Sequence, residues 1–241
     1  MVPIVAVVGR TKSTPVETTN MSILHTPPTE RLLELTTPNG DEVLREMEAR
    51  ADRKGFPIVG AEVGAILRLL ARTTGAESVF EFGSGFGYSA YWIAPVVGPD
   101  GRIVLTEVDA DELDDARTYF ERSGYDDRAS FELGDAMEIV ERYDGPFEMV
   151  LLDHMNADYV DAFEIVRGKV PEGGVVIADN VLKSSETLPE DIETYMRGGD
   201  PARGGTTPAE LTGYFRHVRD DPDFETTPIP VGDGLFVSVR I

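Results

Sequence analysis

The 241-residue chain contains 44 acidic and 22 basic residues, so its formal net charge at pH 7 is −22. A surface with this excess of carboxylates repels nucleic acids and anionic membranes, and we expect neither as a partner. The chain has no cysteine, which excludes disulfides, thiolate metal sites and a cysteine nucleophile.

The first 28 residues are rich in Thr, Ser and Pro and show no helical period, so they are predicted to form a flexible tail. The apolar run at residues 2–8 is broken by Pro3, lacks a basic leading region and is shorter than the roughly 18 residues of a membrane span. We therefore expect no signal peptide, a cytoplasmic location, and a single domain over residues 29–241.

Apolar residues at helical spacing predict three helices before Gly75. The Pro-Ile-Val-Gly segment at 57–60 interrupts the pattern before the third helix. The apolar positions are Leu32, Leu33 and Leu35 in the first helix, Val43, Leu44 and Met47 in the second, and Ala65, Ile66, Leu67, Leu69 and Leu70 in the third.

Strands then alternate with helices, which predicts βαβ units, a mainly parallel sheet and right-handed crossovers. Residues 183–205 are rich in Gly, Pro, Ser and acids and are expected to form a long loop, of the kind that is either a functional lid or a disordered stretch. A helix at 208–220 and a hairpin with strands at 225–230 and 234–240 should end the chain. The earlier strands are expected at 78–83, 102–108, 129–133, 147–153 and 174–179, and the helices between them at 87–96, 111–123, 136–142 and 157–169.

A glycine-rich turn follows the first predicted strand. Gly83, Gly85 and Gly87 let the backbone turn sharply and approach a ligand closely. Glu81 places an ionisable group in an otherwise apolar strand, where it needs a polar partner. Glu107 ends the next strand, 24 residues after Gly83, which is about where an acid binds a ribose diol. Together these features predict a cofactor that carries adenosine.

Other predicted strands also end in carboxylates, and ligands of open α/β sheets bind at that edge. Each acid has a simpler explanation as the N-cap of the next helix. Asp109 with Glu112 matches a capping box, which leaves Glu107 free for ribose. Asp135 is equally compatible with a cap and with a cofactor contact.

Two strand ends offer three oxygen ligands together. Asp153 ends one strand, and Asp179 and Asn180 end the next. Hard oxygen ligands without cysteine suit Mg²⁺, Mn²⁺ or Ca²⁺. The sequence therefore predicts a divalent cation site with positions left open for a substrate hydroxyl.

At this point five stretches resemble the cation-dependent O-methyltransferases, the family that includes catechol and caffeoyl-CoA O-methyltransferases. The resemblance covers residues 29–241, and the motifs are specific in combination. They read Glu-Phe-Gly-Ser-Gly-Phe-Gly-Tyr-Ser-Ala at 81–90, Thr-Glu-Val-Asp at 106–109, Gly-Asp-Ala at 134–136, Leu-Leu-Asp-His at 151–154 and Gly-Gly-Val-Val-Ile-Ala-Asp-Asn-Val-Leu at 173–182.

The resemblance implies a Rossmann-like class I methyltransferase fold. Its sheet is mostly parallel and seven-stranded, with a C-terminal antiparallel hairpin and helices on both faces. It also implies S-adenosylmethionine as cofactor, Mg²⁺, transfer of a methyl group to a metal-bound hydroxyl of a small catechol-like or phenolic substrate, and a possible homodimer. The implied metal ligands are Asp153, Asp179 and Asn180, and the implied cofactor-binding residues are Val59, Glu81, Gly83, Ser84, Ser89, Glu107, Asp135, Ala136, His154 and Met155.

The sequence departs from the family at two positions. The family's catalytic lysine, three residues after the metal aspartate, is replaced by Asn156, which cannot take up a proton near neutral pH. Asp153 and Asn156 are the expected catalytic pair, although Asn156 could instead cap a helix near Ala157. Thr226-Thr227 stands where catechol enzymes carry an acid, so the methyl acceptor stays open.

Two other functions compete with methyl transfer. One is a nucleotide-dependent oxidoreductase on a Rossmann fold, and the other is a protein that binds S-adenosylmethionine without catalysis. A further expectation concerns the whole chain. Only four of its 22 cationic residues are lysine, and with the excess of acids this resembles proteins from salt-loving organisms. An ordinary acidic enzyme is the alternative.

Overall fold

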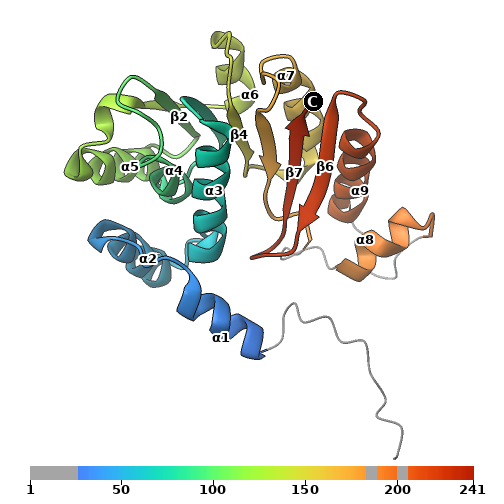
Figure 1. Ribbon diagram of the computed structural model, residues 1–241, viewed down its shortest axis with the longest axis horizontal. Coiled ribbons are helices and arrows are strands. Elements are labelled where there is room, and N and C mark those ends of the chain that lie inside the picture. The colour runs from blue at the N-terminus through green and yellow to red at the C-terminus, as the bar shows by residue number, and fades with distance from the viewer. Residues whose placement is uncertain (1–26, 183–188, 200–205) are drawn as a thin grey trace, which may run out of the picture. The chain divides into compact units, whose positions relative to one another are not determined.

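The computed structural model describes residues 27–182, 189–199 and 206–241. The chain divides into two compact units, Met1–Leu35 and Thr36–Ile241, and each is described by itself. Helix α1 (Pro27–Thr36) spans this boundary (Figure 1). Pro27 and Pro28 are thus helical, and the rest of the predicted tail lies outside the described residues. The second unit contains the sheet and all the elements discussed below.

The sheet has seven strands in the order β3-β2-β1-β4-β5-β7-β6. The first five strands along the chain pair in parallel, β7 pairs antiparallel with β5, and β6 pairs antiparallel with β7. This confirms the predicted parallel sheet with a C-terminal antiparallel hairpin. The strands are β1 (Ser78–Phe82), β2 (Arg102–Glu107), β3 (Ala129–Leu133), β4 (Met149–Leu152), β5 (Val175–Ala178), β6 (Phe224–Ile229) and β7 (Leu235–Arg240).

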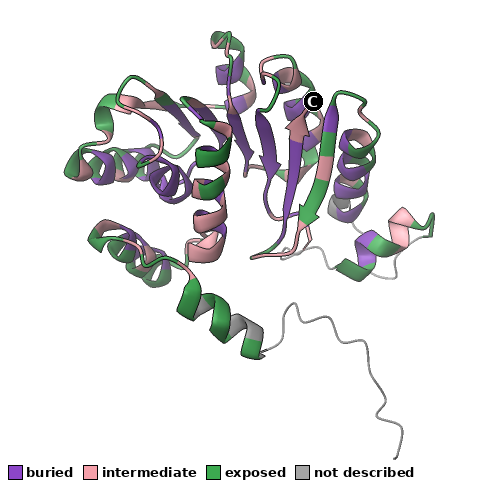
Figure 2. Cartoon of the chain, viewed as in Figure 1, coloured by how far each residue is buried: buried purple, intermediate pink, exposed green. Residues whose placement is uncertain are grey.

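Helices cover both faces of the sheet, as predicted. Successive strand residues point to opposite faces, so in β1 Val79 packs into one core and Phe80 into the other. Helices α2 (Glu42–Lys54), α3 (Gly60–Thr74), α4 (Tyr88–Ile93) and α5 (Ala110–Ser123) contribute to the first core. The second core receives α6 (Ala136–Ile139), α7 (Tyr159–Arg167), α8 (Pro189–Met196) and α9 (Thr206–Arg219). Figure 2 shows the central strands buried and β6 partly exposed.

Local signals explain where several helices begin and end. Gly55, Gly75 and Gly124 end α2, α3 and α5 in the left-handed conformation that glycine adopts most easily. Asp109 caps α5 by accepting the backbone N–H of Asp111. The expected capping box is not completed, because the buried side chain of Glu112 pairs instead with Arg50 at 2.7 Å.

The described elements differ from the predicted ones in three places. The loop expected over 183–205 contains helix α8, and the rest of that segment lies outside the described residues. The helix expected at 136–142 ends at Ile139 and continues as a 3₁₀ turn, η2 (Val140–Arg142). The helix expected at 157–169 is preceded by a 3₁₀ turn, η3 (Asn156–Asp158); another short 3₁₀ turn, η1 (Asp126–Arg128), precedes β3. Among the described helices, none is both long and apolar enough to cross a membrane.

Candidate active site

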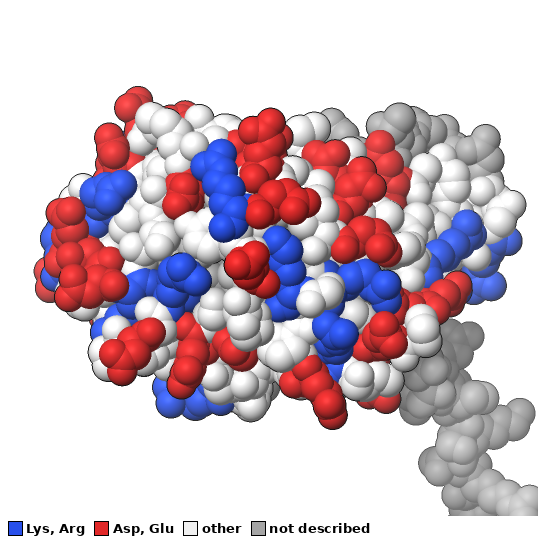
Figure 3. Space-filling view, turned by 90° about the horizontal axis from the view of Figure 1, so that it is seen from above, with Lys and Arg blue, Asp and Glu red and all other residues white. Residues whose placement is uncertain are grey.

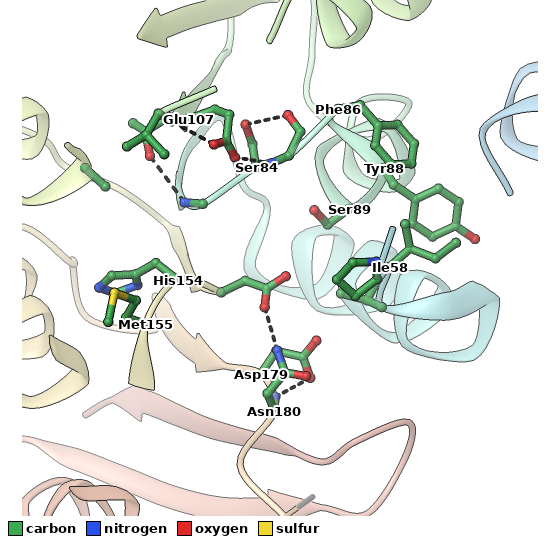
Figure 4. A pocket seen from close by; sticks show the side chains of 18 of the residues that line it. Ile58, Ser84, Phe86, Tyr88, Ser89, Glu107, His154, Met155, Asp179 and Asn180 are labelled. Atoms are coloured by element: carbon green, nitrogen blue, oxygen red, sulfur yellow. Dashed lines mark hydrogen bonds between the residues drawn. The ribbon is translucent and has the colours of Figure 1, made fainter. Parts of the chain in front are cut away.

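A cavity of about 700 Å³ opens at the carboxyl edge of the parallel strands. The glycine turn, the ends of β2, β4 and β5, the loop before α3 and the β6–β7 turn all line it. Figure 4 shows Glu107 on one side and Asp179 and Asn180 on the opposite side, with His154 and Ile58 on the remaining two. The structure therefore brings the predicted metal ligands, and all the predicted cofactor residues except Glu81, around one space.

The glycine turn is held by the end of β2. The backbone N–H of Ser84 donates to the Thr106 carbonyl at 2.8 Å, and the Thr106 hydroxyl donates to the Glu81 carbonyl at 2.6 Å. Gly83 has φ +78°, and a Cβ there would lie 2.7 Å from the carbonyl oxygen of Asp153. Only glycine fits at this close contact between the segments that follow the parallel strands β1 and β4, and Gly83 lines the cavity with bare backbone.

Glu107 stands at the end of β2 with its carboxylate fixed by three backbone donors. Oε2 accepts the N–H of Gly85 at 2.9 Å, and Oε1 accepts those of Val108 and Asp109 at 2.7 and 3.0 Å. A carboxylate has about four acceptor positions, so the three backbone donors leave about one free for a ribose hydroxyl. The contacts also show that Glu107 orients the glycine turn, a role that the sequence pattern did not reveal.

Glu81 lies beneath the cavity wall rather than in it. Its side chain is 1% exposed, Oε1 accepts a short hydrogen bond from the Ser89 hydroxyl, and Oε2 is buried without a partner among the described residues. Burial raises the pKa of Glu81 to about 7; the Ser89 hydrogen bond opposes this and the Glu107 charge adds to it. Ser89 lines the cavity, so Glu81 reaches a ligand through Ser89.

The residues expected around the adenine also line the cavity. Asp135 caps α6 through the N–H of Met137 at 2.9 Å and also lines the cavity together with Ala136, so both of its proposed roles are compatible with the structure. His154 lines the cavity too, and its ring nitrogens are buried without described partners. Burial lowers the pKa of His154, which keeps the ring neutral at pH 7.

The three predicted metal ligands meet at the ends of β4 and β5. The Asn180 side-chain amide donates to Asp153 Oδ1 at 2.8 Å, and its backbone N–H donates to Asp179 Oδ1 at 2.7 Å. Burial raises the pKa of Asp179 to about 6, even though the Asn180 N–H lowers it. Burial also raises the pKa of Asp153, and the charge of Asp179 adds to this effect.

These oxygens fit a hard divalent cation. Two acids held together in a low-dielectric wall repel each other unless a cation or protons compensate them. No Lys or Arg is found among the described residues that line the cavity. The set contains only two carboxylates, and no group of three or more His, Cys, Asp or Glu suited to a metal occurs in the described part of the chain. Asn180 would have to supply the third protein oxygen.

Asn156 is not among the residues that line the cavity. It begins η3, and its Nδ2 is buried without a described partner. Its expected alternative role, a side-chain cap, is also not formed, because neither η3 nor α7 has a side-chain cap. The catalytic role of Asn156 stays a prediction.

The loop before α3 supplies a wall that sequence reasoning recognised only at Val59. Phe56 and Ile58 also line the cavity, as do Phe86 and Tyr88 of the glycine turn. The Phe56 and Phe86 rings pack edge to face at 5.2 Å. Behind them, the guanidinium of Arg50 lies 4.1 Å from the Phe86 ring centre. The aromatic residues on either side of Gly87 were the signal available in the sequence.

Comparison with known proteins gives a consistent assignment. The sequence profile of a family described as O-methyltransferase matches residues 36–241. Catechol O-methyltransferase of Mycobacterium tuberculosis is 30% identical over 167 residues, which cover 68% of this chain and 76% of that protein. Tricin synthase 2 of Oryza sativa subsp. japonica is 26% identical over 212 residues, 85% of this chain and 71% of that protein.

Solved structures share the fold. The O-methyltransferase TomG from Streptomyces achromogenes, in complex with S-adenosylmethionine, superposes with a TM-score of 0.77 at 24% identity, covering 88% of this chain and 96% of that one. An O-methyltransferase from Bacillus cereus in complex with S-adenosylhomocysteine gives a TM-score of 0.75 at 21% identity, covering 89% and 97%.

Proposed function

We propose a methyl-transfer reaction for this chain, which belongs to the O-methyltransferase family. In this reaction the methyl group of S-adenosylmethionine passes to a hydroxyl oxygen of a small catechol-like or phenolic acceptor. The observation that carries the proposal is the single cavity that joins Glu107 and the glycine turn to the oxygens of Asp153, Asp179 and Asn180.

The residues of the chain divide the work between binding and orientation. Glu107 would accept a ribose hydroxyl, and the bare backbone at Gly83 would let the cofactor approach β1. Ser89, backed by Glu81, would meet the polar methionine end. The protein's contribution to the rate is then mainly positioning and fixed electrostatics, because bound S-adenosylmethionine itself supplies the reactive methyl group.

Asp153, Asp179 and Asn180 would hold a divalent cation, with Mg²⁺ the natural choice for three oxygen ligands. Such a cation, when bound, lowers the pKa of a coordinated hydroxyl. The two acids suit this role because burial raises the pKa of both carboxyl groups, so a bound cation would favour their ionised forms. The M. tuberculosis relative carries the name catechol O-methyltransferase, which supports an ortho-diphenol as the first acceptor to test.

Transfer of label from methyl-labelled S-adenosylmethionine to a panel of ortho-diphenols tests the reaction. We expect activity with Mg²⁺ or Mn²⁺ and its loss in excess chelator. Full activity in chelator would remove the cation from the proposal, and cofactor binding without transfer to any hydroxyl would favour a non-catalytic protein. Tighter binding of NAD than of S-adenosylmethionine would favour the oxidoreductase alternative.

Calorimetry on Glu107→Ala tests the cofactor site separately. Charge-assisted hydrogen bonds contribute on the order of 1.5–3 kcal/mol, so binding of S-adenosylmethionine should weaken at least about tenfold. Glu121→Ala, which removes an exposed acid from α5, is the control for loss of charge. Equal affinity of the two variants would contradict the assignment of Glu107 to the ribose.

A further inference from the structure

The peptide between Asp179 and Asn180 has an unusual conformation. Asn180 has φ +57°, and it is the only non-glycine residue with positive φ in the described part of the chain. Adjacent residues of an extended strand point to opposite sides, so a turn of the backbone is needed to bring both side chains to one site. Asn tolerates the left-handed region better than most residues, but the conformation still needs support from its surroundings.

Tyr159 supplies part of that support. Its hydroxyl donates to the carbonyl oxygen of Asp179 at 3.0 Å, while the other end of the same peptide, the Asn180 N–H, is bound to Asp179 Oδ1. Both polar ends of the peptide are therefore fixed. Tyr159 begins α7, six residues after Asp153. The same short segment of chain therefore carries a predicted metal ligand, Asp153, and the tyrosine that holds the two ligands at the end of β5.

The tyrosine ring itself has little freedom. Tyr159 is fully buried, with ring centres 5.4 Å from His154 and 5.5 Å from Tyr214. A buried ring fixed by aromatic neighbours holds its hydroxyl in one place, which is the requirement for a group that orients another.

We propose that Tyr159 is a positioning residue for the cation site: its hydroxyl fixes the Asp179–Asn180 peptide so that both side chains face Asp153. Tyr159 does not line the cavity, and besides this peptide its hydroxyl faces the side chain of Asn156. The inference rests on the cation site of the proposed function. It predicts that loss of one oxygen atom weakens cation binding while cofactor binding is retained.

The neighbouring Tyr214 provides a matched control. It is equally buried and in ring contact with Tyr159, but its hydroxyl makes no hydrogen bond within the described residues. Tyr159→Phe and Tyr214→Phe thus remove the same atom from the same aromatic cluster. They differ in whether that atom holds the Asp179 carbonyl.

Calorimetric titration of the full chain with Mg²⁺ and, separately, with S-adenosylmethionine tests the proposal. For Tyr159→Phe we expect about tenfold weaker Mg²⁺ binding, the equivalent of one lost hydrogen bond of about 1.4 kcal/mol, with cofactor affinity within about twofold of wild type. Tyr214→Phe should match wild type in both. In activity assays Tyr159→Phe should raise the Mg²⁺ concentration needed for half-maximal rate, and saturating Mg²⁺ should restore kcat.

Three results would overturn the proposal, and they differ in whether the proposed function also fails. If the wild-type protein binds Mg²⁺ and Tyr159→Phe binds it equally well, the role of Tyr159 is refuted and the proposed function stands. Wild-type protein that binds neither Mg²⁺ nor Mn²⁺ refutes the cation site together with the role of Tyr159. An equal loss of cofactor and cation affinity in Tyr159→Phe would make the residue structural only.

Discussion

Glu81 has a charge state that is set by its position in the sheet. The carboxyl group sits in β1 between apolar neighbours, with one oxygen bound by Ser89 and the other without a described partner. Burial therefore raises its pKa to about 7 from an ordinary value near 4.5. Near neutral pH the group is poised between its two states, and a cationic ligand at Ser89 would favour the ionised one.

The same shift makes folding depend on pH. Below about pH 4.5 Glu81 is protonated in both the folded and unfolded states and contributes no penalty. Between pH 4.5 and 7 the unfolded chain releases the proton while the folded chain retains it, so the free energy of unfolding falls as pH rises. Above pH 7 the full penalty is present, on the order of 3 kcal/mol for a shift of this size.

Glu81→Gln should remove this contribution, because the amide oxygen can still accept from Ser89. We expect urea unfolding of the cofactor-free protein in chelator to show the variant gaining stability relative to wild type from pH 5 to pH 8. The charge of Glu81 also raises the pKa of Asp153, so the difference includes the change in Asp153 titration that loss of this charge brings, which acts in the same direction. A difference that stays constant across this pH range would show that Glu81 is ionised in the fold.

At the scale of elements, the cavity depends on how closely the chain segments approach each other where the neighbouring parallel strands β1 and β4 end. Gly83 and Gly75 both have positive φ, at +78° and +64°, but a Cβ at Gly83 meets the Asp153 carbonyl while one at Gly75 meets nothing within 4 Å. The two Ala variants therefore have the same free-energy cost of a left-handed backbone. Only Gly83→Ala also forces the chain away from Asp153.

Gly75→Ala should lower the free energy of unfolding by roughly 1–2 kcal/mol, the cost of the left-handed conformation alone. Gly83→Ala should lose about 1–3 kcal/mol more through the contact and should also weaken binding of S-adenosylmethionine. Chemical denaturation and calorimetry measure the two effects. Equal losses of stability in the two variants would mean that the strand ends separate without cost.

The helices and strands were predicted well where apolar residues recur at regular spacing or form continuous runs. The strands of the sheet are short apolar runs bounded by Gly and acids, and these were placed to within about two residues. Helix α8 was missed because its sequence, Pro-Glu-Asp-Ile-Glu-Thr-Tyr-Met, has few apolar residues and lies among turn formers. Its burial of Ile192 in the second core comes from tertiary packing, which a local pattern does not contain.

The site was predictable to the extent that strand ends determine it. Carboxyl ends of parallel strands share one edge, so Glu107, Asp153 and Asp179 had to meet there. The supporting contacts were hidden, because the hydrogen bond from Tyr159 to Asp179 and the pair of Arg50 with Glu112 join residues 20 and 62 positions apart. No periodic pattern encodes such pairs.

For the whole molecule, charge is the property that the fold has to accommodate. Some acids are paired, as at Arg50, and on the face drawn in Figure 3 Lys and Arg lie among the Asp and Glu side chains. Pairing cannot neutralise the chain, because acids outnumber bases two to one. The acids of the cavity wall add repulsion at the site itself. Repulsion between carboxylates therefore destabilises the folded state, and dissolved ions screen this repulsion.

We expect the melting temperature to rise steeply with KCl. The screening length falls from about 10 Å at 0.1 M to about 3 Å at 1 M, so repulsion between separated carboxylates largely disappears over this range. Sucrose is the matched control, since it favours the compact state by exclusion from the surface without screening charge. Scanning calorimetry in chelator, with KCl and sucrose series compared at equal osmolality, separates the two effects. A halophilic protein should respond far more strongly to KCl than to sucrose. Equal responses would show that an excess of 22 negative charges does not limit the stability of this fold, and the halophilic prediction would then be wrong.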